Sequence, residues 1–269
     1  HTMSPNERLR HLDFEQMSTV EMAQAKSMLA RLKLPVKPLI SRRTAAASIG
    51  RRLDRPATLR SAIRQGGDLK ALRMRKSCIR WPDLVILCDI SGSMRQYSRM
   101  VLHFAHAVAN QKGAGWAKVY SFTFGTRLTN ISRQLQTKDV DAALASAGTQ
   151  AKDWDGGTRI AACLHAFNRD WSRRVLGQGA LVLLITDGLE TDQGADLSCE
   201  MQRLRLSARR LIWLNPLLRW DKFEVKAAGI KAMLPHVDSF RSAHSIASLQ
   251  ELASVISEPE DYGQKRRLL

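Results

Sequence analysis

The sequence lacks any long hydrophobic run. Its longest uninterrupted apolar stretch, residues 180–185, has only six residues, whereas a membrane-spanning helix needs about 20. The sequence therefore predicts no transmembrane span. The beginning of the chain also lacks a positively charged segment followed by an apolar stretch and small residues, the pattern that is typical of a secretory leader.

Cysteine is scarce as well. The 269 residues contain four cysteines, and no two of them form a C-x-x-C pair. This spacing is typical neither of a disulfide framework nor of a cysteine-based zinc site. Together with the missing leader, it predicts reduced thiols and a cytoplasmic protein.

Positive charge, in contrast, is abundant and unevenly placed. The chain has 42 Lys and Arg against 25 Asp and Glu, a net charge of +17. Residues 37–80 hold 13 basic and 2 acidic residues, which accounts for 13 − 2 = +11 of the total. Such a segment suits an acidic protein, RNA or an anionic membrane surface. Because it has no aromatic side chain to stack on bases, we favour an acidic protein partner, or a contribution to solubility alone, over nucleic acid.

The N-terminal third of the chain is predicted to be helical at first and then irregular. Apolar side chains recur at intervals of three and four over residues 6–34, which indicates amphipathic helices that end before Pro35 and Pro38. The basic segment is predicted to be a partly extended arm with a short helix over residues 58–65. We therefore expect a helical segment and basic arm over residues 3–80, a main domain over 81–257 and a C-terminal tail over 258–269.

The main domain alternates between strand and helix patterns. The predicted strands cover residues 84–88, 119–124, 128–131, 181–186, 211–214 and 236–240. The predicted helices cover residues 98–111, 140–147, 159–171, 197–208, 223–233 and 245–256. This alternation predicts an α/β, Rossmann-like, doubly wound and mostly parallel six-stranded sheet with helices on both faces. In such sheets ligands bind beyond the carboxyl ends of the strands.

Oxygen-bearing side chains stand where that rule places a ligand. Asp89, Ser91 and Ser93 form a D-x-S-x-S turn after the first buried strand, and we expect the intervening glycine to allow a close backbone turn. Asp187 follows the most apolar strand, and Thr158 follows a Gly-Gly pair between the two strands. Taken singly, each of these residues is typical of a helix cap or a turn. Together they favour one site for a hard divalent cation.

The three segments D-x-S-x-S, G-G-T and T-D-G, in this order, resemble the metal-ion-dependent adhesion site of von Willebrand factor A domains over residues 81–256. The resemblance implies that Asp89, Ser91, Ser93, Thr158 and Asp187 hold Mg²⁺ or Mn²⁺, with some carboxylate contacts through water. It also implies a coordination position left for a carboxylate of a partner protein. The site is then a docking device, and we expect no enzymatic activity.

The flanking segments are similar to the CoxE-like branch of these proteins over residues 50–256. The similar segments are Arg51-Arg52-Leu53-Asp54, Thr58-Leu59-Arg60, Tyr97-Ser98, residues 124–128, residues 154–160 and residues 213–217. This resemblance implies a MoxR-type AAA+ ATPase as a partner. It also implies a role in maturing a metalloenzyme client, a molybdenum hydroxylase such as aerobic carbon monoxide dehydrogenase. Trp154, beside the glycine pair, is equally typical of a partner contact and of a side chain packed on the sheet.

Two other functions remain open from the residues alone. One is a metal-dependent phosphohydrolase with Asp89 as its nucleophile, although Ser91 stands where such enzymes carry a second acid. The other is nucleic-acid binding through the basic arm, which we consider the weaker hypothesis. An independent ATPase is disfavoured because the sequence has no G-x-x-x-x-G-K-[ST] loop.

Overall fold

The computed structural model describes residues 5–111, 115–136, 158–177, 179–189, 196–219, 225–258 and 260–268. They divide into two compact units. Lys37–Trp81 forms one unit, which we call the arm unit, and the remaining residues form the other, which we call the main domain.

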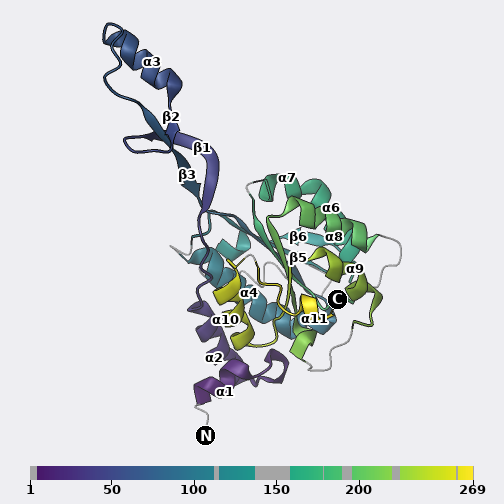
Figure 1. The fold of residues 1–269 in the computed structure, drawn as a ribbon. Helices are drawn as coiled ribbons and strands as arrows, with labels where there is room; N and C mark the ends of the chain where they lie inside the picture. The colour runs from purple at the N-terminus through teal and green to yellow at the C-terminus, as the bar shows by residue number, and fades with distance from the viewer. Residues whose placement is uncertain are drawn as a thin grey trace. The chain divides into compact units, whose positions relative to one another are not determined.

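The main domain is built on one six-stranded sheet (Figure 1). Its strands are β4 (Leu84–Asp89), β5 (Val119–Phe124), β6 (Leu128–Asn130), β7 (Leu181–Ile185), β8 (Arg210–Asn215) and β9 (Ser239–Ser242). The spatial order is β6-β5-β4-β7-β8-β9, and β6 pairs antiparallel with β5 while the other pairs are parallel. The predicted fold class is confirmed.

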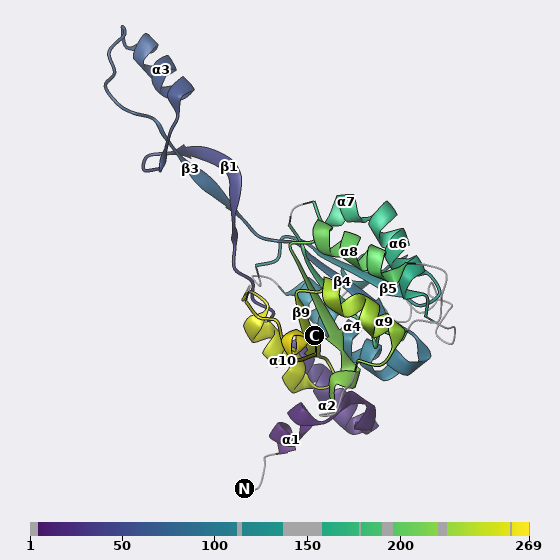
Figure 2. The same ribbon diagram turned by 45° about the vertical axis from the view of Figure 1, so that its right-hand side comes forward.

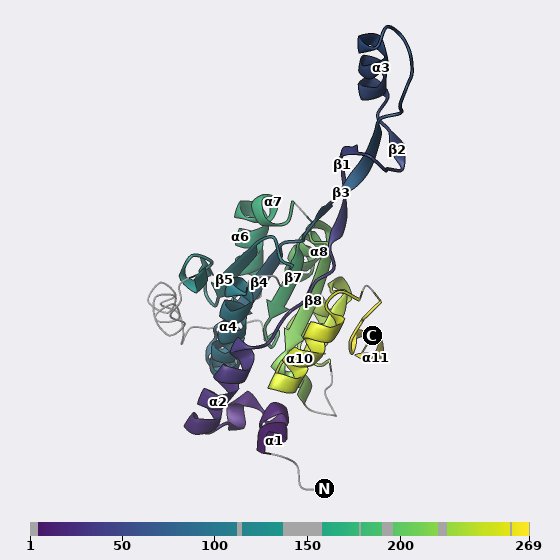
Figure 3. The same ribbon diagram turned by 90° about the vertical axis from the view of Figure 1, so that its left-hand side faces the viewer.

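Helices cover both faces of this sheet, as the turned views show (Figures 2 and 3). One face carries α4 (Arg95–Asn110) and α10 (Ile246–Val255), and the other carries α6 (Ile160–Asp170), α7 (Ser172–Val175), α8 (Leu197–Ser207) and α9 (Ala228–Met233). Short segments η2 (Gly92–Met94), η3 (Gln134–Gln136), η4 (Pro216–Arg219), η5 (Leu234–His236) and α11 (Lys265–Leu268) complete the domain.

The strands alternate between two hydrophobic cores. In β4, Leu84, Ile86 and Cys88 belong to the core under α4 and α10, whereas Val85 and Leu87 belong to the core under α6 and α8. All five side chains are at most 1% exposed. Because successive strand residues point to opposite faces, a strand covered on both sides must be apolar throughout. That requirement explains the uninterrupted apolar runs in the sequence.

Three N-terminal elements belong to the main domain and pack against α4 and α10. They are α1 (Pro5–His11), η1 (Phe14–Gln16) and α2 (Thr19–Ala30). Phe14 and Leu29 are fully buried in the same core as α4 and α10. The backbone N–H of Phe14 donates to the carbonyl of His244 (2.9 Å), and the indole N–H of Trp116 donates to the carbonyl of Leu34 (2.8 Å).

A polar cluster fastens η1 to the carboxyl end of the sheet. Arg219, at the end of η4, donates through Nη1 to Asp13 Oδ2 (2.9 Å), to Glu15 Oε2 (2.7 Å) and to the hydroxyl of Tyr97. The Tyr97 hydroxyl, on the first turns of α4, donates in turn to Asp13 Oδ1 (2.9 Å). Burial and the neighbouring Asp13 carboxylate raise the pKa of Tyr97, so this hydroxyl keeps its proton. The cluster joins segments about 80 to 200 residues apart in the chain.

Tyr97→Phe is expected to lower the free energy of unfolding by about 1–2 kcal/mol, because it removes a hydroxyl that is hydrogen-bonded to the buried Asp13 carboxylate. Urea denaturation followed by tryptophan fluorescence measures the change. Tyr120→Phe is the matched control, since Tyr120 is only partly buried and its hydroxyl has no hydrogen bond to a described residue. Equal losses in the two variants would contradict a stabilising role for the cluster.

The arm unit contains a small sheet that the sequence pattern did not predict. Its elements are β1 (Leu39–Ala47), β2 (Arg52–Leu53), α3 (Arg55–Arg64) and β3 (Met74–Arg80), with strand order β1-β3-β2 and antiparallel pairing. We expected an extended segment and a helix over residues 58–65, and the helix begins three residues earlier. Asp54 explains that start, because its Oδ1 accepts the backbone N–H of Ala57 (3.1 Å) and so caps the helix.

The remaining predictions agree with the structure to different degrees. The strand expected at residues 236–240 begins later, at Ser239, because Leu234–His236 forms η5 with Pro235 inside it. The helix expected at 223–233 begins later, at Ala228, because residues 225–227 are not helical and Ala227 has an extended backbone. The helix expected at 140–147 lies outside the described residues. No helix in the described part of the chain has the length and apolarity needed to cross a membrane.

Candidate metal centre

The strand order reverses beside β4, and the predicted ligands lie at that point. The chain runs from β4 outward to β5 and β6 on one side, and then returns to β7, β8 and β9 on the other. Asp89 is the last residue of β4, and Asp187 stands two residues after the end of β7. Cys88 pairs in register with Ile185, so both carboxylates lie at the same edge of the sheet. A crevice for ligands forms at such a reversal, because the connections on either side diverge.

Asp89 is enclosed at the floor of the site. Its side chain is buried, Oδ1 accepts the backbone N–H of Ser91 (2.9 Å) and Oδ2 accepts the hydroxyl of Thr186 (2.7 Å). Burial, opposed by these hydrogen bonds and reinforced by the negative charge of Asp187, raises the pKa of Asp89 to about 6. A carboxylate that is costly to ionise in this way gains from a nearby cation.

Two serines connect this floor to the second carboxylate. The hydroxyl oxygens of Ser91 and Ser93 lie 3.3 Å apart, and the Ser93 hydroxyl donates to Asp187 Oδ2 over 2.7 Å. Ser91 is buried, whereas Ser93 is exposed. The D-x-S-x-S turn and the T-D-G segment of the predicted site therefore meet. They meet at a surface that solvent or a partner protein can reach.

The backbone around Asp187 is held on both sides. Asp187 Oδ1 accepts the backbone N–H of Leu189 (2.9 Å), and its carbonyl accepts the side-chain amide of Asn215 (2.9 Å). Gly188 has φ of +78°, a conformation that favours glycine. A Cβ atom at this position would lie 2.8 Å from the Trp213 ring, so glycine also provides the space for the buried tryptophan.

Thr158 reaches the same edge from the start of α6. Arg159 donates its backbone N–H to the carbonyl of Gly125 (3.0 Å), directly after β5. One residue earlier in that strand end, the carbonyl of Phe124 accepts the backbone N–H of Ile90 (2.9 Å). Arg159, which follows Thr158, and Ile90, which follows Asp89, are thus bonded to the consecutive residues Gly125 and Phe124 at the end of β5. Thr158 is buried. Residues 151–157, with Trp154 and the Gly-Gly pair, lie outside the described residues.

One expectation about this site is wrong. Gly92 was expected to allow a close backbone turn, but its φ is not positive and a Cβ atom would meet no atom within 4 Å. The turn is instead shaped by η2 and by the hydrogen bond from the Ser91 N–H to Asp89. Glycine at this position therefore leaves open surface beside Ser93.

Three further residues support the site, although the sequence pattern assigned none of them a role there. Thr186 bonds Asp89, Asn215 holds the Asp187 carbonyl, and Ser98 on α4 donates to the carbonyls of Asp89 and Met94. Their signal in the sequence is weak, because a Thr, an Asn or a Ser near the end of a strand or the start of a helix is common. Only the folded structure shows which of them contacts the site.

The donors at this edge suit a hard divalent cation. All are oxygen atoms of carboxylates and hydroxyls, the ligands preferred by Mg²⁺ and Mn²⁺. In the part of the chain that the structure describes, no three His, Cys, Asp or Glu side chains are grouped so as to share a metal ion. Any cation held here therefore depends on the hydroxyls of Ser91, Ser93 and Thr158 as well as on the two carboxylates.

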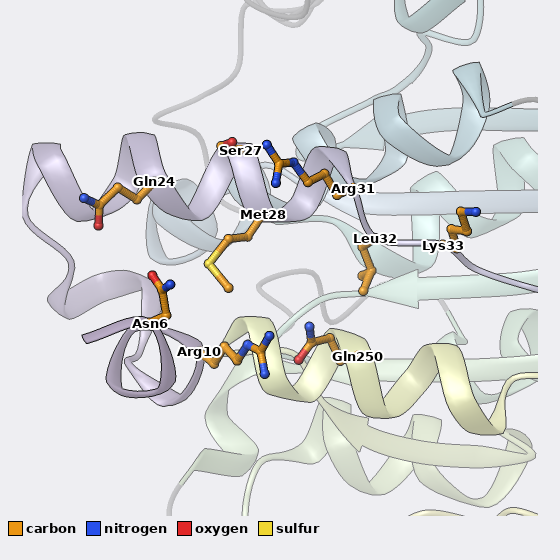
Figure 4. A pocket seen from close by; sticks show the side chains of 9 residues that line it. All are labelled: Asn6, Arg10, Gln24, Ser27, Met28, Arg31, Leu32, Lys33 and Gln250. Atoms are coloured by element: carbon orange, nitrogen blue, oxygen red, sulfur yellow. The ribbon is translucent and has the colours of Figure 1, made fainter. Parts of the chain in front are cut away.

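A separate hollow of about 710 Å³ lies between α1, α2 and α10 (Figure 4). It is lined by Asn6, Arg10, Gln24, Ser27, Met28, Arg31, Leu32, Lys33 and Gln250. Three of these side chains are basic and none is acidic. None of the five predicted ligands lines this hollow, so it is not part of the candidate metal centre.

Several solved structures are similar to part of this chain at low sequence identity. Proximal thread matrix protein 1 from the mussel byssus, with a zinc-occupied MIDAS motif, has 15% identity and a TM-score of 0.41, over 67% of this chain and 48% of that chain. BatB from Bacteroides thetaiotaomicron has 14% identity and a TM-score of 0.43, over 66% and 98%. The pilus adhesin SpaC from Lactobacillus rhamnosus GG has 14% identity and a TM-score of 0.45, over 65% and 29%. The present chain thus spans about half the length of the mussel protein.

Curated proteins yielded no match to this chain. A family model did match: the VWA domain containing CoxE-like protein family, over residues 27–249. That range includes the arm unit, the whole sheet and all five predicted ligands. The chain therefore belongs to the CoxE-like family of proteins that contain a von Willebrand factor A domain.

Proposed function

We propose that this protein is a non-enzymatic, metal-dependent adaptor. In this proposal Asp89, Ser91, Ser93, Thr158 and Asp187 hold Mg²⁺ or Mn²⁺ at the carboxyl edge of the sheet. The observation that carries the proposal is the contact of Ser93 Oγ with Asp187 Oδ2 at 2.7 Å, between residues 94 positions apart in the chain. Membership of a von Willebrand factor A family is consistent with a role in protein interaction.

The chemistry of the five residues supports docking. Two carboxylates roughly neutralise a divalent cation, and neutral hydroxyls leave it able to attract one more anionic oxygen. Magnesium requires about six oxygen ligands, so five side chains leave a place for an exchangeable one. A cation bound here would supply a Lewis-acidic position for a carboxylate oxygen, and exposed Ser93 lies where a partner's Asp or Glu can approach.

We propose a MoxR-type AAA+ ATPase, or its metalloenzyme client, as the protein that contributes this carboxylate. The resemblance of the chain to CoxE-like proteins motivates the choice, and a molybdenum hydroxylase such as aerobic carbon monoxide dehydrogenase is the corresponding client. The adaptor would then present the client to the ATPase, in the cytoplasm, during maturation of the metalloenzyme.

The test is a pull-down of the purified cognate ATPase and client by the full chain, in magnesium and in chelator. Binding is expected in magnesium and at least a tenfold loss in EDTA, in Ser93→Ala and in Asp187→Ala, since each change removes the cation or one of its ligands. Ser254→Ala on α10 is the control, because the Ser254 hydroxyl is exposed and bonds only the nearby Glu251 carbonyl among the described residues. Unchanged binding in EDTA and in both site variants would refute the proposal.

The non-enzymatic part has its own test. The protein is expected not to turn over a generic aryl phosphate in magnesium. Steady magnesium-dependent turnover that Asp89→Asn abolishes would instead establish the phosphohydrolase alternative.

A further inference from the structure

The arm unit carries most of the exposed apolar side chains in the described part of the chain. Eight of the twelve exposed large hydrophobic residues lie between Ile40 and Ile79. Four of them gather in residues 55–73, which we call the arm tip: Leu59 (63% exposed), Ile63 (67%), Leu69 (63%) and Leu72 (57%). Leu59 and Ile63 are one turn apart on α3, so they lie on one side of that helix. Such a cluster on a small unit indicates a surface that another molecule covers.

The same arm tip contains a hollow lined by three arginines. The hollow has a volume of about 390 Å³, and its lining consists of Ala57, Arg60, Ser61, Arg64, Gln65 and Arg73. No carboxylate and no aromatic ring is among the lining residues. Arg60, Arg64 and Arg73 are exposed, and none forms an ion pair with any residue that the structure describes. Three arginines therefore line one hollow whose lining contains no acidic residue.

Local hydrogen bonds hold the two sides of the hollow together. The backbone N–H of Arg73 donates to the hydroxyl of Thr58 (2.9 Å), and the carbonyl of Arg73 accepts the backbone N–H of Asp54 (2.7 Å). Asp54 also pairs with Arg75 on β3 (3.0 Å). These contacts place Arg73 next to the helix that carries Arg60 and Arg64. The arginines are thus brought together by buried Asp54 and Thr58 and not by chance proximity of long side chains.

We propose that the arm tip docks an acidic amphipathic helix of a partner protein. Carboxylates of that helix pair with Arg60, Arg64 and Arg73, since guanidinium groups bind carboxylates with two parallel hydrogen bonds. Its apolar side chains cover Leu59 and Ile63. An apolar centre beside a charged rim is the usual composition of a protein interface. This site is separate from the candidate metal centre and does not rest on the proposed function.

Charge complementarity and composition favour this occupant over the others. A second copy of the arm unit would bring the same positive charge against it, because residues 37–80 carry a net +11. Single-stranded nucleic acid is bound by stacking on aromatic side chains, and residues 37–80 contain none; phosphates also leave the exposed leucines uncovered. A membrane-surface helix carries Trp, Phe or Leu on its apolar face. Because α3 has Leu59 but no aromatic side chain, binding to a membrane is made an outcome of the test.

The test is fluorescence polarisation with the full chain and a labelled synthetic helical peptide that has Glu on one face and Leu beside it. EDTA is present throughout, so the candidate metal centre makes no contribution. Saturable binding is expected, with at least a tenfold loss of affinity in the double variant R60E/R64E and at least a fivefold loss in L59S/I63S. R42E/R43E on β1 is the matched control: it makes the same change in net charge at exposed arginines of the same unit, and less than a threefold loss is expected. Circular dichroism checks that each variant folds.

Several outcomes would overturn the inference. Equal losses in R60E/R64E and R42E/R43E would mean a diffuse attraction to the whole basic arm. Absence of saturation at millimolar peptide would mean that no such docking site exists. A mixed-sequence RNA oligonucleotide or phosphatidylglycerol vesicles could bind more tightly and displace the peptide. That result would mean that the arm tip binds phosphate groups and not an acidic helix. None of these outcomes bears on cation binding, so this inference and the proposed function can fail separately.

Discussion

Asp89→Asn is expected to stabilise the cation-free protein and to abolish the stabilisation that magnesium provides. The Asp89 carboxyl is fully buried, and its pKa is raised from 3.8 to about 6 because burial penalises the charged form. A raised pKa favours folding while the acid is protonated, and this contribution is lost as the pH rises through about 6. At neutral pH the ionised carboxylate therefore weakens the cation-free fold, and an amide removes that cost. We expect a gain of about 1–3 kcal/mol in EDTA.

Magnesium should reverse the order of stability, so that the wild type becomes more stable than Asp89→Asn. A ligand that binds only the folded state adds about 2.7 kcal/mol at one hundred times its dissociation constant. The wild type is expected to gain this increment, whereas Asp89→Asn is expected to gain almost none. Thermal unfolding in EDTA and across a magnesium series measures both effects. Asp196→Asn is the control, since Asp196 is not one of the five predicted ligands and Asn caps α8 as well as Asp does. A full magnesium response in Asp89→Asn would refute Asp89 as a ligand.

Gly188→Ala is expected to lower the free energy of unfolding by about 2–4 kcal/mol and to weaken cation binding. Its φ of +78° costs a residue with a side chain about 1–2 kcal/mol. The new Cβ atom would also lie 2.8 Å from Trp213 and 3.0 Å from Ile230, both buried, and such overpacking costs about 1–3 kcal/mol. Relief of the contact must shift the backbone that carries Asp187.

Gly92→Ala provides the matched comparison for this variant. Gly92 belongs to the same site, but it has no positive φ and a Cβ atom there meets nothing within 4 Å. Its free energy of unfolding is expected to stay within about 0.5 kcal/mol of the wild type. Urea denaturation and a magnesium titration of both variants make the measurement. Similar losses at the two glycines would show that the backbone at Gly188 is not under the constraint described here.

The sequence predicted the architecture of the main domain because its signals are local. Strands covered on both faces must be apolar throughout, and β4 and β7 are the clearest such runs. Parallel strands end at a common edge, so side chains directly after two neighbouring strands were expected to meet. The hydrogen bond between Ser93 and Asp187 agrees with that expectation. The excess of positive charge in residues 37–80 likewise follows directly from the numbers of basic and acidic residues in the sequence.

The sequence by itself thus determined the succession of strands in the main domain, the choice of five oxygen-bearing residues for the candidate metal centre and the basic character of the arm. The tertiary structure decided that η1 is fastened to Tyr97 and Arg219, that β1 pairs with β3, and that three arginines meet at the arm tip. It also decided that Gly188, and not Gly92, is the glycine the site requires. The reason is physical: strand and helix patterns arise from neighbours along the chain, whereas these contacts join residues brought together only by folding, and no periodicity encodes them.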